Sequence, residues 1–157
     1  MARAKLDAYE PPRGPMKVPP GPSIETLKLH FNPTQLNLVK ETHWARHSAR
    51  LAEHTSVPEF LGSHPRTLTI SLLFDDSYPD GNVDKKIKTL TEWCEPERSS
   101  IRRNEASPPW LKFVWGGVST VGFWMVLKRL SVQYTLFSDQ GRVLRAQCEL
   151  VLEEVGV

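Results

Sequence analysis

The stretch from Leu127 to Leu152, LKRLSVQYTLFSDQGRVLRAQCELVL, consists of two alternating runs that flank a polar turn. A three-residue loop at Asp139-Gln140-Gly141, with Gly141 in the left-handed conformation that glycine adopts without strain, makes these runs the strands of a β-hairpin. Residues equally distant from Gln140 then face each other. On one face this register predicts the apolar pairs Leu130/Leu150, Val132/Cys148, Tyr134/Ala146 and Leu136/Leu144. On the other face it predicts the polar pairs Ser131/Glu149, Gln133/Gln147 and Thr135/Arg145.

The clean separation of these two faces specifies the register. A slip of one residue would move every apolar side chain of one strand to the polar face. We therefore expect the apolar face to join a hydrophobic core, and the polar face to meet water or a polar channel.

Two further segments alternate with the period of two that is typical of strands. In RTLTISLLF, which begins at Arg66, four apolar side chains point one way: Leu68, Ile70, Leu72 and Phe74. In TLKLHF, which begins at Thr26, the same pattern places Leu27, Leu29 and Phe31 on one face. The turn pair Asn32-Pro33 ends this second strand, and a weaker alternation resumes over residues 36–47.

One segment has the spacing of a helix. Val83, Ile87, Leu90 and Cys94 form a stripe at intervals of three and four residues, and Asp80 or Asn82 can cap the first turn. Pro96 ends the helix. The following residues, 97–107, are predicted to form a polar loop.

Two segments lack any sustained period. Residues 46–65 contain Pro58, Gly62 and Pro65 and are predicted to form a long irregular loop, which in a compact domain is often a contact surface. Residues 11–23 hold six of the thirteen prolines and suit an extended arm. We therefore divide the chain into a proline-rich arm at 1–23, with one possible short edge strand, and a β domain at 24–157.

The stretch PPWLKFVWGG, from Pro108 to Gly117, is apolar on both faces of a short strand. One interpretation is a central strand that is buried on one side and covered by a helix or loop on the other. The alternative is that one face meets another subunit, where tryptophan is favoured as an anchor.

The order of these elements is strand, strand, loop, strand, helix and three further strands. It predicts a mainly β fold, an antiparallel β-barrel or sandwich with one packed α-helix.

Composition excludes several classes of protein. The chain has 157 residues, of which 39% are hydrophobic, and this fits one globular domain with a core. Neither a membrane-spanning segment nor a secretory signal is expected, because no apolar run is long enough and MARAKLDAYE lacks a hydrophobic stretch. A net charge of +2 gives no indication of a nucleic-acid partner. Cys94 and Cys148 fit two buried thiols better than a disulfide bridge.

No pattern indicates an enzyme, a metal site or a cofactor. His43 and His47 are four residues apart but lack the glutamate of the zinc-binding HExxH pattern. The carboxylates of Asp75-Asp76 and of Glu153-Glu154 are adjacent in sequence, so on a strand they point apart and form no catalytic pair. A binding or structural role is therefore favoured.

Four stretches together resemble a known family: LHFNPTQLNLVKETHW, GSHPRTLTISLLFDDS, PPWLKFVWGG and the hairpin sequence quoted first. They are similar to the tube-domain baseplate proteins, or tube initiators, of contractile injection systems, the phage-tail-like particles of bacteria. The pattern resembles that of the tube domain in the LysM-containing adaptor between spike and tube. The resemblance covers roughly residues 24–152.

The resemblance implies a tube-like β-barrel and a structural role in a baseplate. Copies would form a six-membered ring that joins the spike to the inner tube and helps to initiate tube assembly in the bacterial cytoplasm. The implied partners are further copies of the chain, the inner-tube protein, the trimeric spike or hub protein and other baseplate subunits, with neither nucleic acid nor a membrane among them. Many relatives carry a LysM domain after the tube domain, whereas this chain stops at Val157, so we expect that domain's contacts to be made by another subunit or not at all.

Two sets of site residues follow from this hypothesis. The side chains expected to line the lumen of the ring are Ser131, Gln133, Thr135, Arg145, Gln147 and Glu149. Those expected to contact neighbouring subunits are His54, Val57, Phe60, Trp110 and Trp115. The alternative is a soluble effector or a small-ligand-binding barrel with the tube fold, which would enclose an apolar pocket within one copy.

Overall fold

The computed structural model describes residues 3–13, 19–48, 56–77, 81–118 and 120–155. Within these ranges the strands are β1 (Lys5–Tyr9), β2 (Ser23–Lys28), β3 (Leu36–Val39), β4 (Thr42–Ser48), β5 (Ser56–Ser63), β6 (Thr67–Asp75), β7 (Trp110–Val114), β8 (Met125–Phe137) and β9 (Val143–Glu154). The helices are α1 (Val83–Glu92) and α2 (Arg98–Arg102).

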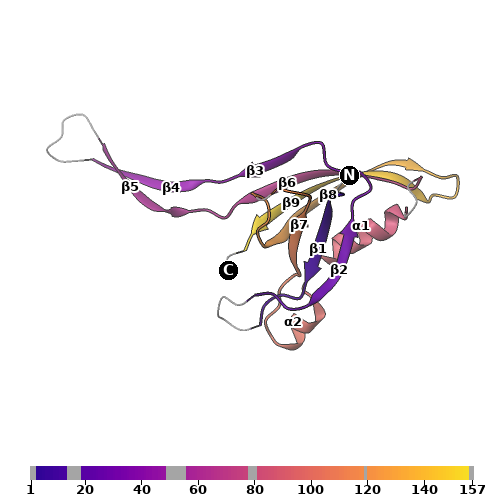
Figure 1. Cartoon of the computed structure of the whole chain (residues 1–157), viewed down its shortest axis with the longest axis horizontal. Coiled ribbons are helices and arrows are strands. Elements are labelled where there is room, and N and C mark those ends of the chain that lie inside the picture. The colour runs from indigo at the N-terminus through magenta and orange to yellow at the C-terminus, as the bar shows by residue number, and fades with distance from the viewer. Residues whose placement is uncertain (1–2, 14–18, 49–55, 78–80, 119, 156–157) are drawn as a thin grey trace.

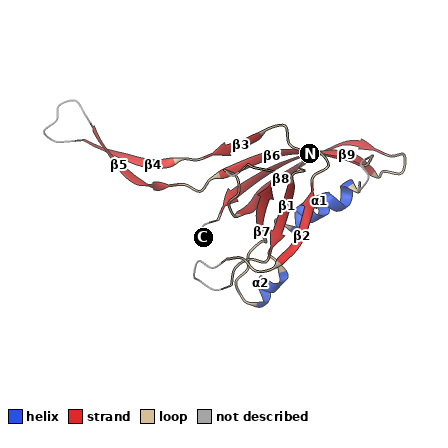
Figure 2. Cartoon of the chain, viewed as in Figure 1, coloured by secondary structure: helices blue, strands red, loops and turns tan. Residues whose placement is uncertain are grey.

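Seven strands form one sheet in the order β2-β1-β7-β8-β9-β6-β3, in which every neighbouring pair is antiparallel. Strands β4 and β5 form a separate two-stranded ribbon. Figure 2 shows how small the helical part is: α1 lies against the sheet, and α2 lies in the connection that leads to β7. The expected mainly β, antiparallel fold with one substantial helix is confirmed.

The core lies between one face of the sheet and α1. The four apolar side chains of β6 that were expected to point one way, Leu68, Ile70, Leu72 and Phe74, are all buried. The helix contributes Val83, Ile87 and Leu90 from its predicted stripe, and it packs against β8 and β9. Its first turn is capped as expected, because the side-chain oxygen of Asn82 accepts a hydrogen bond of 3.1 Å from the backbone N–H of Lys85.

The β8–β9 hairpin has the predicted register over most of its length. Leu130 pairs with Leu150, Ser131 with Glu149, Val132 with Cys148, Gln133 with Gln147 and Tyr134 with Ala146. The turn is also the predicted one: Gly141 has φ 82°, and its N–H donates to the carbonyl of Ser138 at 2.9 Å.

At one point near the turn, the predicted register is wrong: the pairs Leu136/Leu144 and Thr135/Arg145 do not form, whereas Phe137 pairs with Val143 as the register requires. Leu136 pairs with Arg145 instead of Leu144, because the register shifts on both sides of Leu136. A shift of this kind adds an unpaired residue to one strand and twists the ribbon. The expectation that Tyr134 and Leu136 would be core residues also fails, since their side chains are 45% and 44% exposed.

The prediction for TLKLHF holds only in its first part. Leu27 and Leu29 are buried, but Phe31 is exposed and His30 is buried instead. The reason is that β2 ends at Lys28, after which the alternation is lost. The ring of His30 packs edge-on against Phe74, and its Nδ1 accepts a hydrogen bond of 3.1 Å from the backbone of Asp75.

Two other expectations are corrected. The N-terminal strand β1 is not at an edge, because it pairs with β2 on one side and β7 on the other, and its Leu6 is completely buried. The segment 97–107 is not entirely a loop, since it contains α2. The carboxylate of Glu97 caps this short helix by accepting a hydrogen bond of 2.9 Å from the N–H of Ser99.

The segment 46–65 was predicted to be a long irregular loop, but residues 46–48 and 56–63 lie in paired strands, and residues 49–55 are outside the described residues. Strands β4 and β5 pair from Thr42↔Ser63 to Ser48↔Ser56. Pro58 is tolerated because both strands of a two-stranded ribbon have a free edge. A register shift next to Trp44 leaves Leu61 as an extra residue in β5.

This ribbon extends the β3–β6 pair beyond the sheet. The two parts are joined by a backbone hydrogen bond of 2.9 Å from His64 to Glu41. Figure 1 shows that β4 and β5 project from the sheet at one end of the long axis of the molecule. We call the strands β4 and β5 the arm, which is distinct from the proline-rich N-terminal segment.

Arg66 holds the base of the arm against the end of β9. Its Nε donates to the carboxylate of Glu154 at 3.0 Å, its backbone N–H donates to the same carboxylate at 3.1 Å, and its guanidinium lies 4.1 Å from the centre of the Phe123 ring. The backbone N–H of Glu154 in turn donates to the carbonyl of Arg66 at 2.8 Å. These contacts explain why an arginine precedes the apolar run of β6.

The assignment of the core face can be tested at Leu150, which is completely buried and faces Ile70 and Leu130. The change Leu150→Asp would bury an unpaired carboxyl group and should lower the free energy of unfolding by roughly 4 kcal/mol. Urea unfolding measures this loss. The neighbouring change Glu149→Ala, on the exposed face, is the control and should alter stability by less than about 0.5 kcal/mol. Equal effects of the two changes would show that the faces are assigned wrongly.

Candidate functional site

The sheet face opposite the core carries the polar row of the β8–β9 hairpin. All six side chains expected on this face are exposed: Ser131, Gln133, Thr135, Arg145, Gln147 and Glu149. Two cross-strand pairs, Ser131↔Glu149 and Gln133↔Gln147, set hydroxyl, carboxylate and amide groups side by side. We call this row the polar face.

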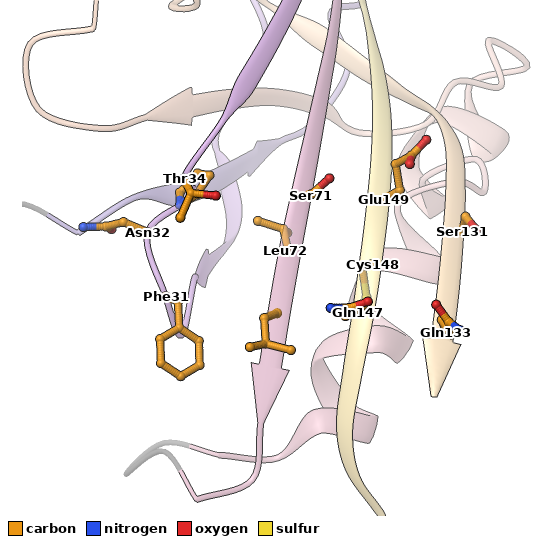
Figure 3. A pocket seen from close by; sticks show the side chains of 12 residues that line it. Phe31, Asn32, Thr34, Ser71, Leu72, Ser131, Gln133, Gln147, Cys148 and Glu149 are labelled. Atoms are coloured by element: carbon orange, nitrogen blue, oxygen red, sulfur yellow. The ribbon is translucent and has the colours of Figure 1, made fainter. Parts of the chain in front are cut away.

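The polar face forms one wall of an open hollow of about 630 Å³. Figure 3 shows Ser71 on β6, Glu149 on β9 and Ser131 on β8, side by side on three neighbouring strands. The turn that begins at Phe31 forms the opposite wall. The lining mixes polar strand side chains with apolar ones such as Leu73 and Phe31. Because the hollow is open to solvent, it does not resemble the enclosed apolar pocket expected of a small-ligand-binding barrel.

Arg145 is on the polar face as expected, but its charge is paired. Its Nε donates to the carboxylate of Asp75 at 2.8 Å. This carboxylate also accepts hydrogen bonds from the backbone and hydroxyl of Ser77, at 2.9 and 2.7 Å. The Ser77 backbone, the Ser77 hydroxyl and the Arg145 guanidinium together lower the pKa of Asp75 from an ordinary 3.8 to about 2.

A second ion pair holds the hairpin turn to the end of β6. The guanidinium of Arg142 binds the carboxylate of Asp76, and the backbone N–H of Asp76 donates to the carbonyl of Leu144 at 2.8 Å. The adjacent aspartates that follow β6 therefore bind two arginines of the hairpin. This explains the acidic turn in structural terms.

The five residues expected to make subunit contacts do not lie together. Val57 and Phe60 lie on the arm and are 57% and 55% exposed. Trp110 and Trp115 lie on and just after β7 and are half-buried, and His54 is outside the described residues. The arm therefore carries the accessible part of this set.

Trp110 belongs to an aromatic cluster on the face of the sheet opposite the core. Its ring centre is 6.5 Å from that of Trp124, which meets Tyr9 edge-on at 5.0 Å and the ammonium of Lys112 at 5.0 Å. Trp115 packs instead against Phe113, at 6.3 Å between ring centres. Both tryptophans are thus engaged within the chain, which favours the interpretation of PPWLKFVWGG as a central strand covered on its second face.

Sequence reasoning missed one of the two exposed aromatic residues of the arm. Trp44 is 53% exposed, lies opposite Phe60, and has its ring centre 5.2 Å from that of Phe60. Phe137, near the hairpin turn, is also 53% exposed and was not singled out. An aromatic residue within a polar, weakly alternating segment was the available signal for Trp44.

The two cysteines are free thiols, as favoured over a bridge, although Cys94 is only partly buried. Burial raises the pKa of Cys148 to about 11, so this thiol is not a nucleophile at neutral pH. Within the described residues, no group of three or more His, Cys, Asp or Glu side chains is placed to hold a metal ion.

A family model described as contractile injection system tube protein matches residues 1–156. No curated protein matches the chain. In the part of the chain that the structure describes, no helix has the length and apolar character needed to cross a membrane.

The contacts of Asp75 predict a dependence of stability on pH. Because the pKa of Asp75 is about 2 in the folded chain and about 3.8 when its contacts are absent, the stabilisation is fully present above pH 3.8 and is lost as the pH falls toward 2. Denaturant unfolding of the wild type should therefore weaken more steeply between pH 4 and pH 2 than that of Asp75→Asn. Asp139→Asn, in the exposed turn, is the control and should keep the wild-type slope. Identical slopes for all three proteins would contradict this role of Asp75.

Proposed function

Because the chain belongs to the contractile injection system tube protein family, we propose that it is a ring-forming baseplate subunit of such a particle. In this proposal six copies close a ring that joins the spike to the inner tube and helps to initiate tube assembly. The subunit acts through its surfaces and not through catalysis. Its partners are further copies, the inner-tube protein, the trimeric spike or hub protein and other baseplate subunits, and the ring assembles in the bacterial cytoplasm.

The observation that carries the proposal is the two-sided character of the sheet. One face is apolar and is partly covered by α1, whereas the polar face, with Gln133 and Gln147 in its centre, is exposed. A wall of a water-filled channel requires such a face, because side chains that line a wide channel remain hydrated. The open hollow beside Ser71 supports the same interpretation, since it adds further polar groups to this wall.

The arm supports the assembly part of the proposal. Its exposed Val57 and Phe60 lie on a ribbon beyond the sheet, where they contribute nothing to the core that α1 covers. Large exposed apolar groups on a projecting ribbon are typical of surfaces that bind another protein. In this proposal the arm provides the principal contacts with neighbouring subunits, whereas Trp110 and Trp115 contribute through their exposed edges.

The double change Gln133→Glu and Gln147→Glu tests the lumen assignment. The two new carboxylates face each other across the hairpin, and their repulsion should cost roughly 1 kcal/mol or less in a hydrated channel. The ring should therefore still assemble. A reconstruction of the assembled baseplate should place the polar face on the lumen.

The control for this experiment is Val132→Glu, which alters the adjacent residue on the core side. Val132 packs against the core, so this change should impair folding before assembly is reached. If the reconstruction placed the polar face on the outer surface of the ring, or sealed it inside one subunit, the lumen assignment would be wrong. The ring role itself would fail if particles assembled normally without this chain.

A further inference from the structure

The exposed apolar side chains are concentrated on two hairpins. Among the described residues, seven of the thirteen large apolar side chains that are exposed lie on β4 and β5 or on β8. We call Trp44, Phe60 and Leu61 the arm cluster, and Tyr134, Leu136 and Phe137 the tip cluster. Their exposed fractions lie between 44% and 55%.

Each cluster lies on a two-stranded ribbon that extends beyond the part of the sheet covered by α1. An isolated two-stranded ribbon is at best marginally stable in water, because it has no core of its own. In the arm the rings of Trp44 and Phe60 are 5.2 Å apart, and at the tip those of Tyr134 and Phe137 are 6.3 Å apart. Each cluster is therefore a paired aromatic surface, and burial against a partner would stabilise both the ring pair and its ribbon.

The two clusters lie at opposite ends of the molecule. Figure 1 shows the arm at one end of the long axis and the turn between β8 and β9 at the other. The tip cluster therefore cannot cover the arm cluster of its own chain. A contact between two copies can join them.

We propose that the arm cluster of one copy docks on the tip cluster of a second copy. This inference deepens the proposed function by naming the pair of surfaces through which copies join. A contact between two arms would be self-complementary, would stop at a dimer, and would leave both tip clusters exposed. A contact from arm to tip covers both clusters and gives every copy one donor surface and one acceptor surface, as a closed ring of more than two copies requires.

The exposed area fits the centre of such an interface. Half-exposed, the four aromatic rings of the two clusters present roughly 400 Å². This is about a quarter to a third of a standard interface, whose remaining area is usually polar and peripheral. Flanking polar atoms of both ribbons must therefore take part in the contact.

A mixing experiment with full-length chains tests the proposal. The arm variant carries Trp44→Ser and Phe60→Ser, the tip variant carries Tyr134→Ser and Phe137→Ser, and the control carries Ile101→Ser and Val118→Ser, two exposed apolar positions away from both clusters. Light scattering over a concentration series should give oligomers larger than dimers for the wild type and the control. Either variant alone should associate at least tenfold more weakly, since buried aromatic anchors dominate interface energies.

The mixture of the two variants is the decisive sample. Each copy of the arm variant retains an intact tip, and each copy of the tip variant retains an intact arm, so the mixture should form a one-to-one dimer and stop there. A wild type that stays monomeric, variants that assemble like the wild type, or a mixture without dimers would each overturn the proposal.

Cysteine cross-linking provides a readout that does not depend on the serine changes. In a Cys94→Ser background, a chain with Trp44→Cys mixed with a chain with Phe137→Cys should form an intermolecular disulfide. Replacing the second partner by a chain with Ile101→Cys should abolish it. Equal cross-linking of both pairs would overturn the docking geometry.

The outcome separates this inference from the proposed function. If both variants enter baseplates as the wild type does, the arm does not dock on the tip, and the role as a ring subunit stands. If no particle contains the chain, the proposed function fails, and the mixing experiment still decides whether copies join through these clusters.

Discussion

Strand β9 is the constraint on which the rest of the structure depends. It pairs with β6 from Thr67↔Glu153 to Asp75↔Arg145 and with β8 along its other edge. Its inward side chains Ala146, Cys148, Leu150 and Leu152 are buried, and the residues between them remain exposed or half-exposed. Because side chains alternate strictly, a slip of β9 would move the apolar row out of the core and the polar row into it. The register of β9 therefore determines both which side chains form the core and which side chains lie on the exposed face.

The two projecting ribbons follow from the lengths of the strands around β9. Helix α1 covers only part of the sheet, so the extensions beyond β6 and at the end of β8 have no layer above them. Ion pairs fix the points at which they leave the sheet: Arg66 with Glu154 at the base of the arm, and Arg142 with Asp76 beside the hairpin turn. The sheet thereby presents its two exposed apolar clusters at fixed positions. A rigid spacing between donor and acceptor surfaces is what a ring of defined size requires.

The sequence predicted the elements in which one local pattern dominates. The hairpin register, the turn at Gly141 and the helical stripe from Val83 to Leu90 were all found, because period and turn chemistry agree there. The polar face followed from the same register. Its six residues are exposed as expected, whereas their place in a lumen is a property of an assembly and is still a prediction.

The failures lie where a local irregularity hides the pattern. The extra residue Leu61, together with Pro58 and Gly62, breaks the alternation of β5, so a paired strand resembled a loop. The register shifts around Leu136 and the end of β2 at Lys28 similarly moved Leu136 and Phe31 to the surface. The central position of β1 depends on pairing with β7, more than a hundred residues later, and no local signal reports such a contact. The local sequence pattern therefore does not predict long-range strand pairing or β-bulges.

The charges on the exposed face determine how strongly a channel lined by this face would attract charged contents. Arg145 is neutralised by Asp75, and Lys128 pairs with Glu153 at 2.9 Å on the neighbouring strand. The remaining groups of the polar face are mostly amides and hydroxyls, with Glu149 as an additional carboxylate. If copies of this face were repeated around an axis, the channel wall would gain many hydrogen-bonding groups but little net charge. Since paired charges produce only short-range fields at physiological ionic strength, the channel of the proposed ring would hydrate its contents without holding them electrostatically.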